Sequence, residues 1–128
     1  MKVLVDSSIW ISYFRTAERE ETLDYLIEEN VIVTNQLILS ELVPFLKVQN
    51  KKRLIDLLYS IEQLPIKIDW DGIVTLQTKA IKSGINGVGI PDLIIAQNAI
   101  QTGALVFSED KHFKLLTEIT KLQIYPKS

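Results

Sequence analysis

Short apolar runs alternate with longer amphipathic segments along this chain of 128 residues. Three of the runs, Val3-Leu4-Val5 among them, are continuously apolar, which is typical of strands buried on both faces in the middle of a parallel sheet. The segments between the runs carry apolar residues at helical spacing. This alternation predicts one α/β domain over residues 1–128, in which helices cover a mainly parallel sheet.

Five strands and six helices are predicted from the pattern. The strands are expected at residues 2–5, 31–34, 64–68, 104–107 and 122–125. The helices are expected from Ser7 or Ser8 to residue 14, and at residues 18–29, 35–48, 51–61, 70–83 and 91–102. Pro44 lacks a backbone donor and should kink the third helix or begin a new one. The sixth helix is apolar almost all round, which predicts that it packs deep against the sheet.

Composition narrows the class of protein. With 47% hydrophobic and 23% charged residues and no apolar segment of membrane-spanning length, a soluble cytoplasmic protein is expected. The absence of cysteine excludes disulfides, thiolate zinc sites and a cysteine nucleophile. A net charge of -2 argues against an extended, sequence-independent DNA binder. The basic residues of segment 47–53 could contact phosphates, but a solvated helix end is the preferred interpretation.

Four acidic residues interrupt or end strongly apolar runs: Asp6, Glu41, Asp92 and Asp110. Carboxylates are almost never buried without a partner, so four of them at the edge of a core need a shared explanation. Asp6 and Asp110 follow predicted strands, and the crevice at the carboxyl ends of strands is the usual functional site of an open α/β sheet. Asp92 lies in a first helical turn and Glu41 on the helix after the second strand. We therefore expect the four carboxylates to converge.

Four carboxylates at close range would need a counter-charge, because each pair at ~4 Å repels by about 4 kcal/mol at an effective dielectric near 20. Few basic residues neighbour them, so a divalent cation is the simplest choice, and an all-oxygen ligand set favours Mg²⁺ or Mn²⁺ over structural zinc. Such ions serve phosphoryl transfer by activating water and stabilising the leaving oxygen. A ribonuclease that uses two histidines is disfavoured, since His112 is the only histidine.

Four segments of the chain resemble the motifs of the PIN domain family, the metal-dependent nucleases that include the VapC-type toxins of toxin–antitoxin pairs. The segments are Val3-Leu4-Val5-Asp6-Ser7-Ser8, Ser40-Glu41-Leu42, Ile90-Pro91-Asp92-Leu93-Ile94-Ile95-Ala96 and Leu105-Val106-Phe107-Ser108-Glu109-Asp110-Lys111-His112-Phe113. Each motif alone is weakly specific, but the four occur in order and span almost the whole chain. One position departs from the pattern, because His112 stands where many relatives carry a second acid.

The resemblance implies a three-layer α/β/α sandwich around a sheet of about five strands, and an endoribonuclease that cleaves single-stranded RNA with one or two Mg²⁺ or Mn²⁺ ions. The metal ligands would be Asp6, Glu41, Asp92 and Asp110. Ser8 and Ser108 would orient a carboxylate or a water molecule. For the toxin branch, the resemblance also implies a homodimer and a cognate antitoxin protein.

Structural interpretations of the same residues remain open. Asp6, Asp92 and Asp110 could cap or stabilise helices, and Glu41 could be an ordinary exposed residue. His112 is expected at the surface or rim rather than among metal ligands. The aromatic residues at positions 10, 13 and 14 are expected in the core or a dimer interface rather than stacked on RNA bases.

The function also has alternatives. The fold could serve a catalytically inactive RNA-binding or regulatory module, or an RNA-processing nuclease that has no antitoxin. Gly84, Gly87 and Gly89 match no phosphate-binding fingerprint, and are expected to form a flexible loop leading to Asp92.

Overall fold

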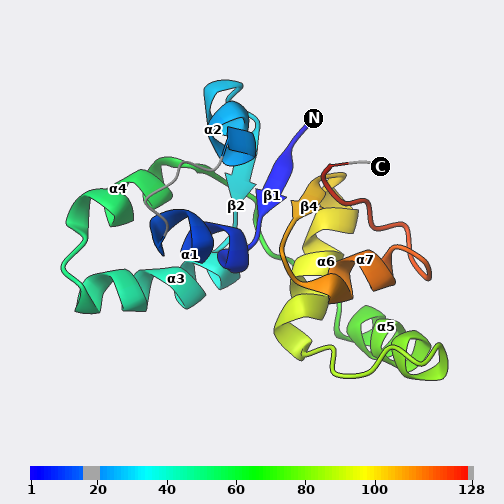
Figure 1. The fold of residues 1–128 in the computed structure, drawn as a ribbon. Helices are drawn as coiled ribbons and strands as arrows, with labels where there is room; N and C mark the ends of the chain where they lie inside the picture. Colours follow the sequence, from blue (N-terminus) through cyan, green and yellow to red (C-terminus); the bar gives the residue numbers. More distant parts are fainter. Residues whose placement is uncertain (16–20, 127–128) are drawn as a thin grey trace.

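A computed structural model of the chain describes residues 1–15 and 21–126. The elements follow one another in the order β1 (Val3–Val5), α1 (Ser7–Arg15), α2 (Glu21–Glu28), β2 (Ile32–Thr34), α3 (Gln36–Val48), α4 (Lys52–Ser60), β3 (Glu62–Gln63), α5 (Trp70–Lys82), α6 (Ile90–Thr102), β4 (Leu105–Phe107) and α7 (Lys111–Leu116). Strands and helices therefore alternate, as the apolar pattern predicts (Figure 1).

The described strands form one parallel sheet in the order β3-β2-β1-β4. Strand β1 lies in the middle, where Val3 pairs with Ile32 of β2 on one side and with Leu105 of β4 on the other. All three residues of β1 are 0% exposed. A strand buried on both faces explains why its sequence is apolar at every position rather than at alternate ones.

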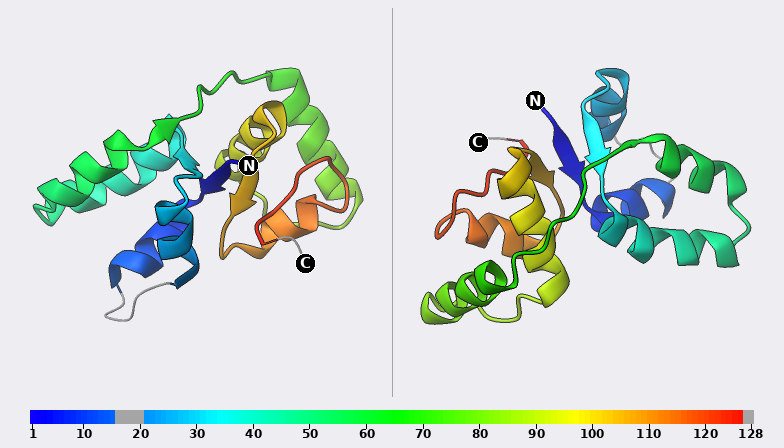
Figure 2. Two further views of the ribbon diagram at one scale, coloured as in Figure 1. Left: turned by 90° about the horizontal axis from the view of Figure 1, so that it is seen from above. Right: turned by 180° about the vertical axis from the view of Figure 1, so that it is seen from behind.

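The helices cover both faces of the sheet. Helices α1 to α4 lie on one side and α5 to α7 on the other (Figures 1 and 2). This arrangement follows from right-handed crossovers: the chain first moves outward from β1 through β2 to β3, then returns past β1 to β4, so the later helices must cross the opposite face. The predicted three-layer α/β/α sandwich with a mainly parallel sheet is confirmed.

The two predicted edge strands differ from the structure. The strand expected at residues 64–68 is wrong, since β3 is formed by Glu62–Gln63 and pairing ends after Leu64 N donates to Thr34 O at 2.8 Å. Pro65 follows directly and has no N–H to continue the ladder. The strand expected at residues 122–125 is reduced to a single parallel bridge between Val106 and Ile124. The described sheet thus has four strands, where about five were predicted.

The predicted helices are present with shifted ends. Helix α1 begins at Ser7, so neither serine precedes it as a cap. Helix α3 runs continuously through Pro44, and no new helix begins there. Helix α2 is seen from Glu21, and its predicted start at residue 18 lies outside the described residues. Within the described ranges, no helix is long and apolar enough to cross a membrane.

Helix α6 packs deep in the molecule, as its composition predicts. Its buried residues include two amides as well as apolar side chains: Leu93, Ile95, Ala96, Gln97, Asn98 and Ala99. Its end is set by Gly103, which adopts a left-handed conformation at φ 73° that favours glycine. Because α6 is fixed along its length, its first turn, which carries Asp92, is held firmly relative to the sheet.

Asn35 joins three parts of the fold directly after β2. Its side chain is fully buried and caps α3 by accepting a hydrogen bond from Ile38 N at 2.9 Å. Its Nδ2 donates to Asn98 Oδ1 on α6 at 2.9 Å, and Asn98 Nδ2 donates to Pro65 O at 3.1 Å. This buried amide chain ties the sheet edge to the helix that carries Asp92.

We predict that Asn35→Ala lowers the free energy of unfolding by about 2 to 3 kcal/mol, because it removes a helix cap and leaves the Asn98 amide without its buried partner. The matched control is Asp69→Ala, since Asp69 caps α5 through Gly72 N but is exposed, and should cost only about 1 kcal/mol. Urea unfolding followed by circular dichroism measures both. Equal losses would contradict the role of the buried amide chain.

Candidate active site

The candidate site lies at the carboxyl ends of β1 and β4, the two neighbouring strands from which the chain leaves toward opposite faces of the sheet. Asp6 follows β1 directly, and Asp6 N donates to Phe107 O at the end of β4 at 2.9 Å. At such a switch point the two loops diverge and leave a crevice, which is the usual binding position in open α/β sheets. The site is therefore placed by strand order as much as by side chains.

Asp6 is 6% exposed and is held by two serines from opposite ends of the sequence. Its Oδ2 accepts hydrogen bonds from Ser8 Oγ at 2.9 Å and from Ser108 Oγ at 2.7 Å. Each hydroxyl also accepts a backbone N–H, from Glu109 and from Asp110 respectively. A serine hydroxyl has one proton. Because each hydroxyl oxygen already accepts a backbone N–H, its own proton points toward Asp6. The buried carboxylate is thus fixed in position and its charge is stabilised.

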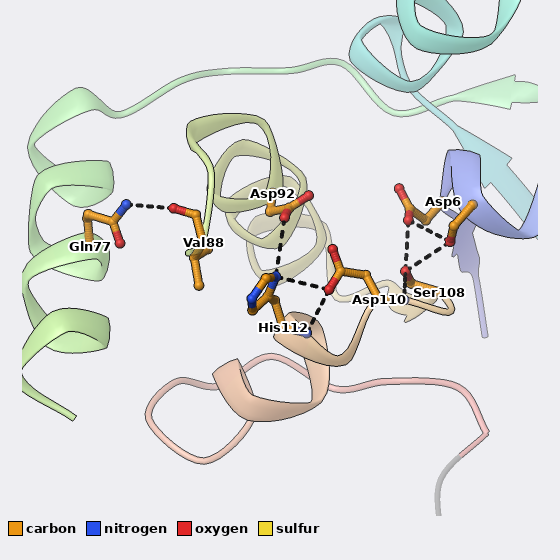
Figure 3. Close-up of polar contacts among 8 residues, drawn as sticks. Asp6, Gln77, Val88, Asp92, Ser108, Asp110 and His112 are labelled. Carbon is orange, nitrogen blue, oxygen red and sulfur yellow. Dashed lines mark hydrogen bonds and ion pairs between the residues drawn. The ribbon is translucent and has the colours of Figure 1, made fainter. Parts of the chain in front are cut away.

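Asp92, Asp110 and His112 form a second group beside Asp6. One ligand atom from each of the three lies within 4.8 Å of the other two. Figure 3 shows these side chains facing one another, with Asp6 and Ser108 to one side. Among residues 1–15 and 21–126, this is the one group of three or more acidic or histidine side chains with metal-ligand spacing.

Asp110 performs two tasks in this group. It is the N-cap of α7, where its Oδ1 accepts a hydrogen bond from His112 N at 2.9 Å. The same oxygen lies 3.0 Å from His112 Nδ1, in an approach that lacks hydrogen-bond geometry, and His112 Nδ1 lies 4.0 Å from Asp92 Oδ2. The capping interpretation of Asp110 is therefore confirmed, and the cap also orients its carboxylate toward the site.

The glycine-containing segment before α6 borders this group. Gly84 and Gly87 have positive φ, and a Cβ at Gly87 would lie 3.7 Å from His112 Nε2. Ile85 and Val88 are buried, and Gln77 Nε2 donates to Val88 O at 2.8 Å (Figure 3). The segment leads to Asp92 as predicted, but it is packed at several points along its length.

Glu41 faces the same site from α3. The residue is exposed, yet partial burial of the carboxyl group is the main cause that raises its pKa, and repulsion from Asp6 and Asp92 adds to the shift. A hydrogen bond with Ser7 opposes the increase. Glu41 is therefore close enough to be repelled by both aspartates, although it lies outside the group formed by Asp92, Asp110 and His112.

The electrostatic strain of the site is greatest at Asp92. Burial, followed by repulsion from Asp110 and Asp6, raises the pKa of Asp92 from 3.8 to about 6, while His112 acts in the opposite direction. Among the described residues, His112 is the one basic side chain within 4.0 Å of these carboxylates. A divalent cation would relieve the repulsion that a single histidine leaves.

The structure brings together most of what the sequence predicts. Asp92 and Asp110 face each other, Asp6 and Glu41 couple to them electrostatically, and Ser8 and Ser108 hold Asp6. Two further residues join the site: Ser7 beside Glu41, and His112, which the sequence analysis expected at the rim. The signal for His112 was present, since it lies two residues after Asp110 and a cap turn brings those side chains together.

Two other predicted features lie outside the acidic group. Trp10 is 1% exposed and stacks on Phe14 with ring centroids 5.8 Å apart, so it belongs to the core and is not available to stack on RNA bases. The basic residues of segment 47–53 are exposed at the end of α3, in the turn and at the start of α4, which is compatible with both interpretations of them. Neither feature contributes to the site.

The donor set fits a divalent cation. Carboxylate oxygens from Asp92 and Asp110 converge, Asp6 lies nearby with a fixed orientation, and His112 Nδ1 is buried without a hydrogen-bond partner among the described residues. Carboxylate oxygens suit Mg²⁺ and Mn²⁺, whereas structural zinc favours a closed set rich in thiolate or imidazole.

An open parallel α/β sheet with converging carboxylates at its switch point defines the class: a hydrolase-like α/β domain with an acidic site suited to a divalent cation. The model of the PIN domain family matches residues 3–119, so the chain belongs to this family, whose members are nucleases. No curated protein sequence matches the chain.

Solved structures with the same fold cover nearly the whole chain. VapBC2 from Rickettsia felis, bound to a DNA fragment from its promoter, has a TM-score of 0.75 at 22% identity and covers 97% of each chain. FitAcB from Neisseria gonorrhoeae has a TM-score of 0.71 at 20% identity and covers 96% of each chain. VapC20 of Mycobacterium tuberculosis, described as a toxin that cleaves the sarcin-ricin loop, has a TM-score of 0.62 at 14% identity, covering 89% of this chain and 94% of that one.

We predict that Asp92→Asn makes the cation-free protein more stable than the wild type as pH rises. The pKa of folded Asp92 lies above its ordinary value, so folding favours the protonated form, and stability is lost as pH increases from about 4 to about 6. Asparagine removes this loss, and the gain above pH 6 should be roughly 1 kcal/mol after allowance for solvent screening.

Urea unfolding in the presence of a chelator, at a series of pH values from about 4 to about 7, measures this difference. Asp56→Asn on the exposed face of α4 is the control and should show no such trend. If the difference in stability between the wild type and Asp92→Asn did not change with pH, the raised pKa of Asp92 would be contradicted.

Proposed function

We propose that this protein is a Mg²⁺- or Mn²⁺-dependent endoribonuclease that acts in the cytoplasm as the toxin of a toxin–antitoxin pair. The observation that carries the proposal is the convergence of Asp6, Asp92 and Asp110 at the sheet's switch point in a PIN domain. Repulsion among these carboxylates favours the binding of a cation, because the cation offsets their negative charge. A bound cation in turn favours the binding of phosphate oxygens.

Each residue has a role that its contacts support. Asp92 and Asp110 bind the cation, and Asp6, fixed by Ser8 and Ser108, presents a carboxylate that cannot turn away. Glu41 completes the acidic ring from α3. A divalent cation held by these residues would supply activation of water and neutralisation of charge on the phosphodiester. The chain itself supplies position, because both serines and the cap of α7 hold the carboxylates in place.

RNA is the preferred substrate on two grounds. A structure of the same fold is described as a toxin that cleaves the sarcin-ricin loop, which is the property of that protein and a guide for this one. In addition, a net charge of -2 argues against a protein that binds duplex DNA over an extended basic surface. A single strand that enters the crevice needs only local phosphate contacts.

We predict that Asp6→Asn lowers metal-dependent cleavage of single-stranded RNA at least 100-fold, because the change removes a negative charge while preserving shape. Ser108→Ala should lower it about 10-fold, since it loosens Asp6 without removing the carboxylate. Cleavage of a labelled RNA with Mn²⁺ or Mg²⁺, compared with the same reaction in a chelator, gives both values.

Asp71→Asn is the matched control, because Asp71 is an exposed acid in the first turn of α5, away from the site. It should cleave like the wild type. Circular dichroism confirms that all variants are folded. If Asp6→Asn cleaved RNA at the wild-type rate, the proposed site would be wrong.

The partner proposal rests on a groove away from the acidic site. Structures of the same fold include DNA-bound VapBC from Salmonella typhimurium, with a TM-score of 0.75 at 16% identity. In this chain, a groove of about 400 Å³ lies among α1, α2, β2, α4 and β3, and is lined by Trp10, Ile27, Asn30, Ile32, Leu57, Ser60, Ile61 and Glu62. Leu57 is 46% exposed there. We propose that an apolar segment of the cognate antitoxin covers this groove.

We predict that Leu57→Asp weakens binding of the antitoxin encoded beside this gene at least 10-fold, because it places a charge on an apolar contact surface. RNA cleavage by the free variant should remain at the wild-type level. Isothermal titration calorimetry measures the affinity, and Val48→Asp, an exposed apolar position at the end of α3 outside the groove, is the control. Unchanged affinity in Leu57→Asp would place the partner elsewhere.

Self-association is also part of the proposal. Trp70, Val74 and Ile81 are exposed apolar side chains at helical spacing on α5, and a second copy would cover them. The mass of the purified chain in solution distinguishes a homodimer from a monomer.

A further inference from the structure

We propose that His112 is a direct ligand of the cation and that the site therefore prefers Mn²⁺ to Mg²⁺. This inference rests on the proposed metal-dependent nuclease and specifies how its site selects an ion. It concerns a residue that differs from the all-carboxylate pattern, and it follows from the spacing and burial of three side chains.

The spacing of the donor atoms suits one ion. His112 Nδ1 lies 3.0 Å from Asp110 Oδ1 and 4.0 Å from Asp92 Oδ2. Around an octahedral ion with bonds of about 2.1 Å, neighbouring ligand atoms are about 3 Å apart and opposite ones about 4.2 Å apart. Both separations from His112 Nδ1 fall in this range, and the Asp92 and Asp110 ligand atoms lie within 4.8 Å of each other, so the three side chains are close enough to share an ion after small rotations.

The nitrogen of His112 that faces the carboxylates, Nδ1, makes no hydrogen bond with any described residue. His112 Nδ1 is buried and has no hydrogen-bond partner among the described residues, although the side chain as a whole is 20% exposed. A buried polar atom without a partner carries a free-energy cost, which ligation would remove. In the neutral tautomer with its proton on Nε2, His112 offers a lone pair at Nδ1 to the ion.

A competing interpretation makes His112 a counter-charge. A protonated imidazole would lie between Asp92 and Asp110 and offset their repulsion, in the way that it opposes the increase in the pKa of Asp92. The imidazolium would then compete with a cation instead of binding it. The two interpretations differ in whether a nitrogen atom is bonded to the ion.

Ion preference follows from the ligand type. Mg²⁺ strongly favours oxygen ligands, whereas imidazole nitrogen suits transition-metal ions. Replacing a carboxylate with an imidazole also removes one negative charge, which weakens the binding of Mg²⁺. We therefore expect the ratio of the Mg²⁺ and Mn²⁺ dissociation constants to be at least 10-fold larger in the wild type than in His112→Asp.

The decisive measurement is pulsed electron paramagnetic resonance of Mn²⁺ bound to the untagged protein. His112 is the only histidine in the chain, so a coupling from imidazole nitrogen can have no other protein source. The wild type should show this coupling, and His112→Gln and His112→Asp should lack it. Lys111→Gln, an exposed neighbour, is the matched control and should keep both the coupling and the ion preference.

Titration calorimetry with Mn²⁺ and with Mg²⁺ supplies the dissociation constants for the same proteins, and circular dichroism confirms their folding. Mn²⁺ that binds without a nitrogen coupling, with equal ion preference in His112→Asp, would overturn the inference and leave the metal-dependent nuclease intact. If the wild type bound neither ion and cleaved no RNA, both the inference and the proposed function would fail.

Discussion

The rest of the structure depends on the burial of β1 between two parallel neighbours. Its three residues are fully buried, and the strand pairs with β2 on one side and with β4 on the other, so it has no free edge. Because the chain leaves β1 toward β2 and later returns to β4, the helices must occupy opposite faces of the sheet. This reversal creates the crevice beside Asp6, and no side chain in the site would be in place without it.

The site is built by holding like charges close together. Serine hydroxyls fix Asp6, a helix cap fixes Asp110, and the buried helix α6 fixes Asp92. Burial and repulsion between the carboxylates raise the pKa values of Asp92 and Glu41. Asp110 can cap α7 and also serve as a metal ligand, because the hydrogen bond from His112 N orients its carboxylate toward Asp92. The same turn brings His112 Nδ1 beside Asp110 Oδ1.

Prediction from sequence succeeded where local chemistry and apolar period agree. The continuous run Val3-Leu4-Val5 identified the central strand, and Gly103 identified the end of α6. It failed at the edges of the sheet, where few contacts define a strand. Alternating apolar residues in segment 64–68 suggested a strand, but Pro65 ends the ladder, and Leu122 and Ile124 pack beside β4 with only one bridge. Edge pairing depends on partners that are distant in sequence.

The sequence by itself determined the α/β class and the alternating order of strands and helices, because both depend on short-range apolar periodicity. It also indicated four acids as candidate site residues, because each is out of place at an apolar run. Only the tertiary structure decided which groups meet. Ser8 and Ser108 share Asp6 although they are 100 residues apart, and Asp92 on α6 meets Asp110 and His112, which follow β4. Sequence spacing does not encode such contacts, because they arise where strand order brings two distant loops to one edge of the sheet.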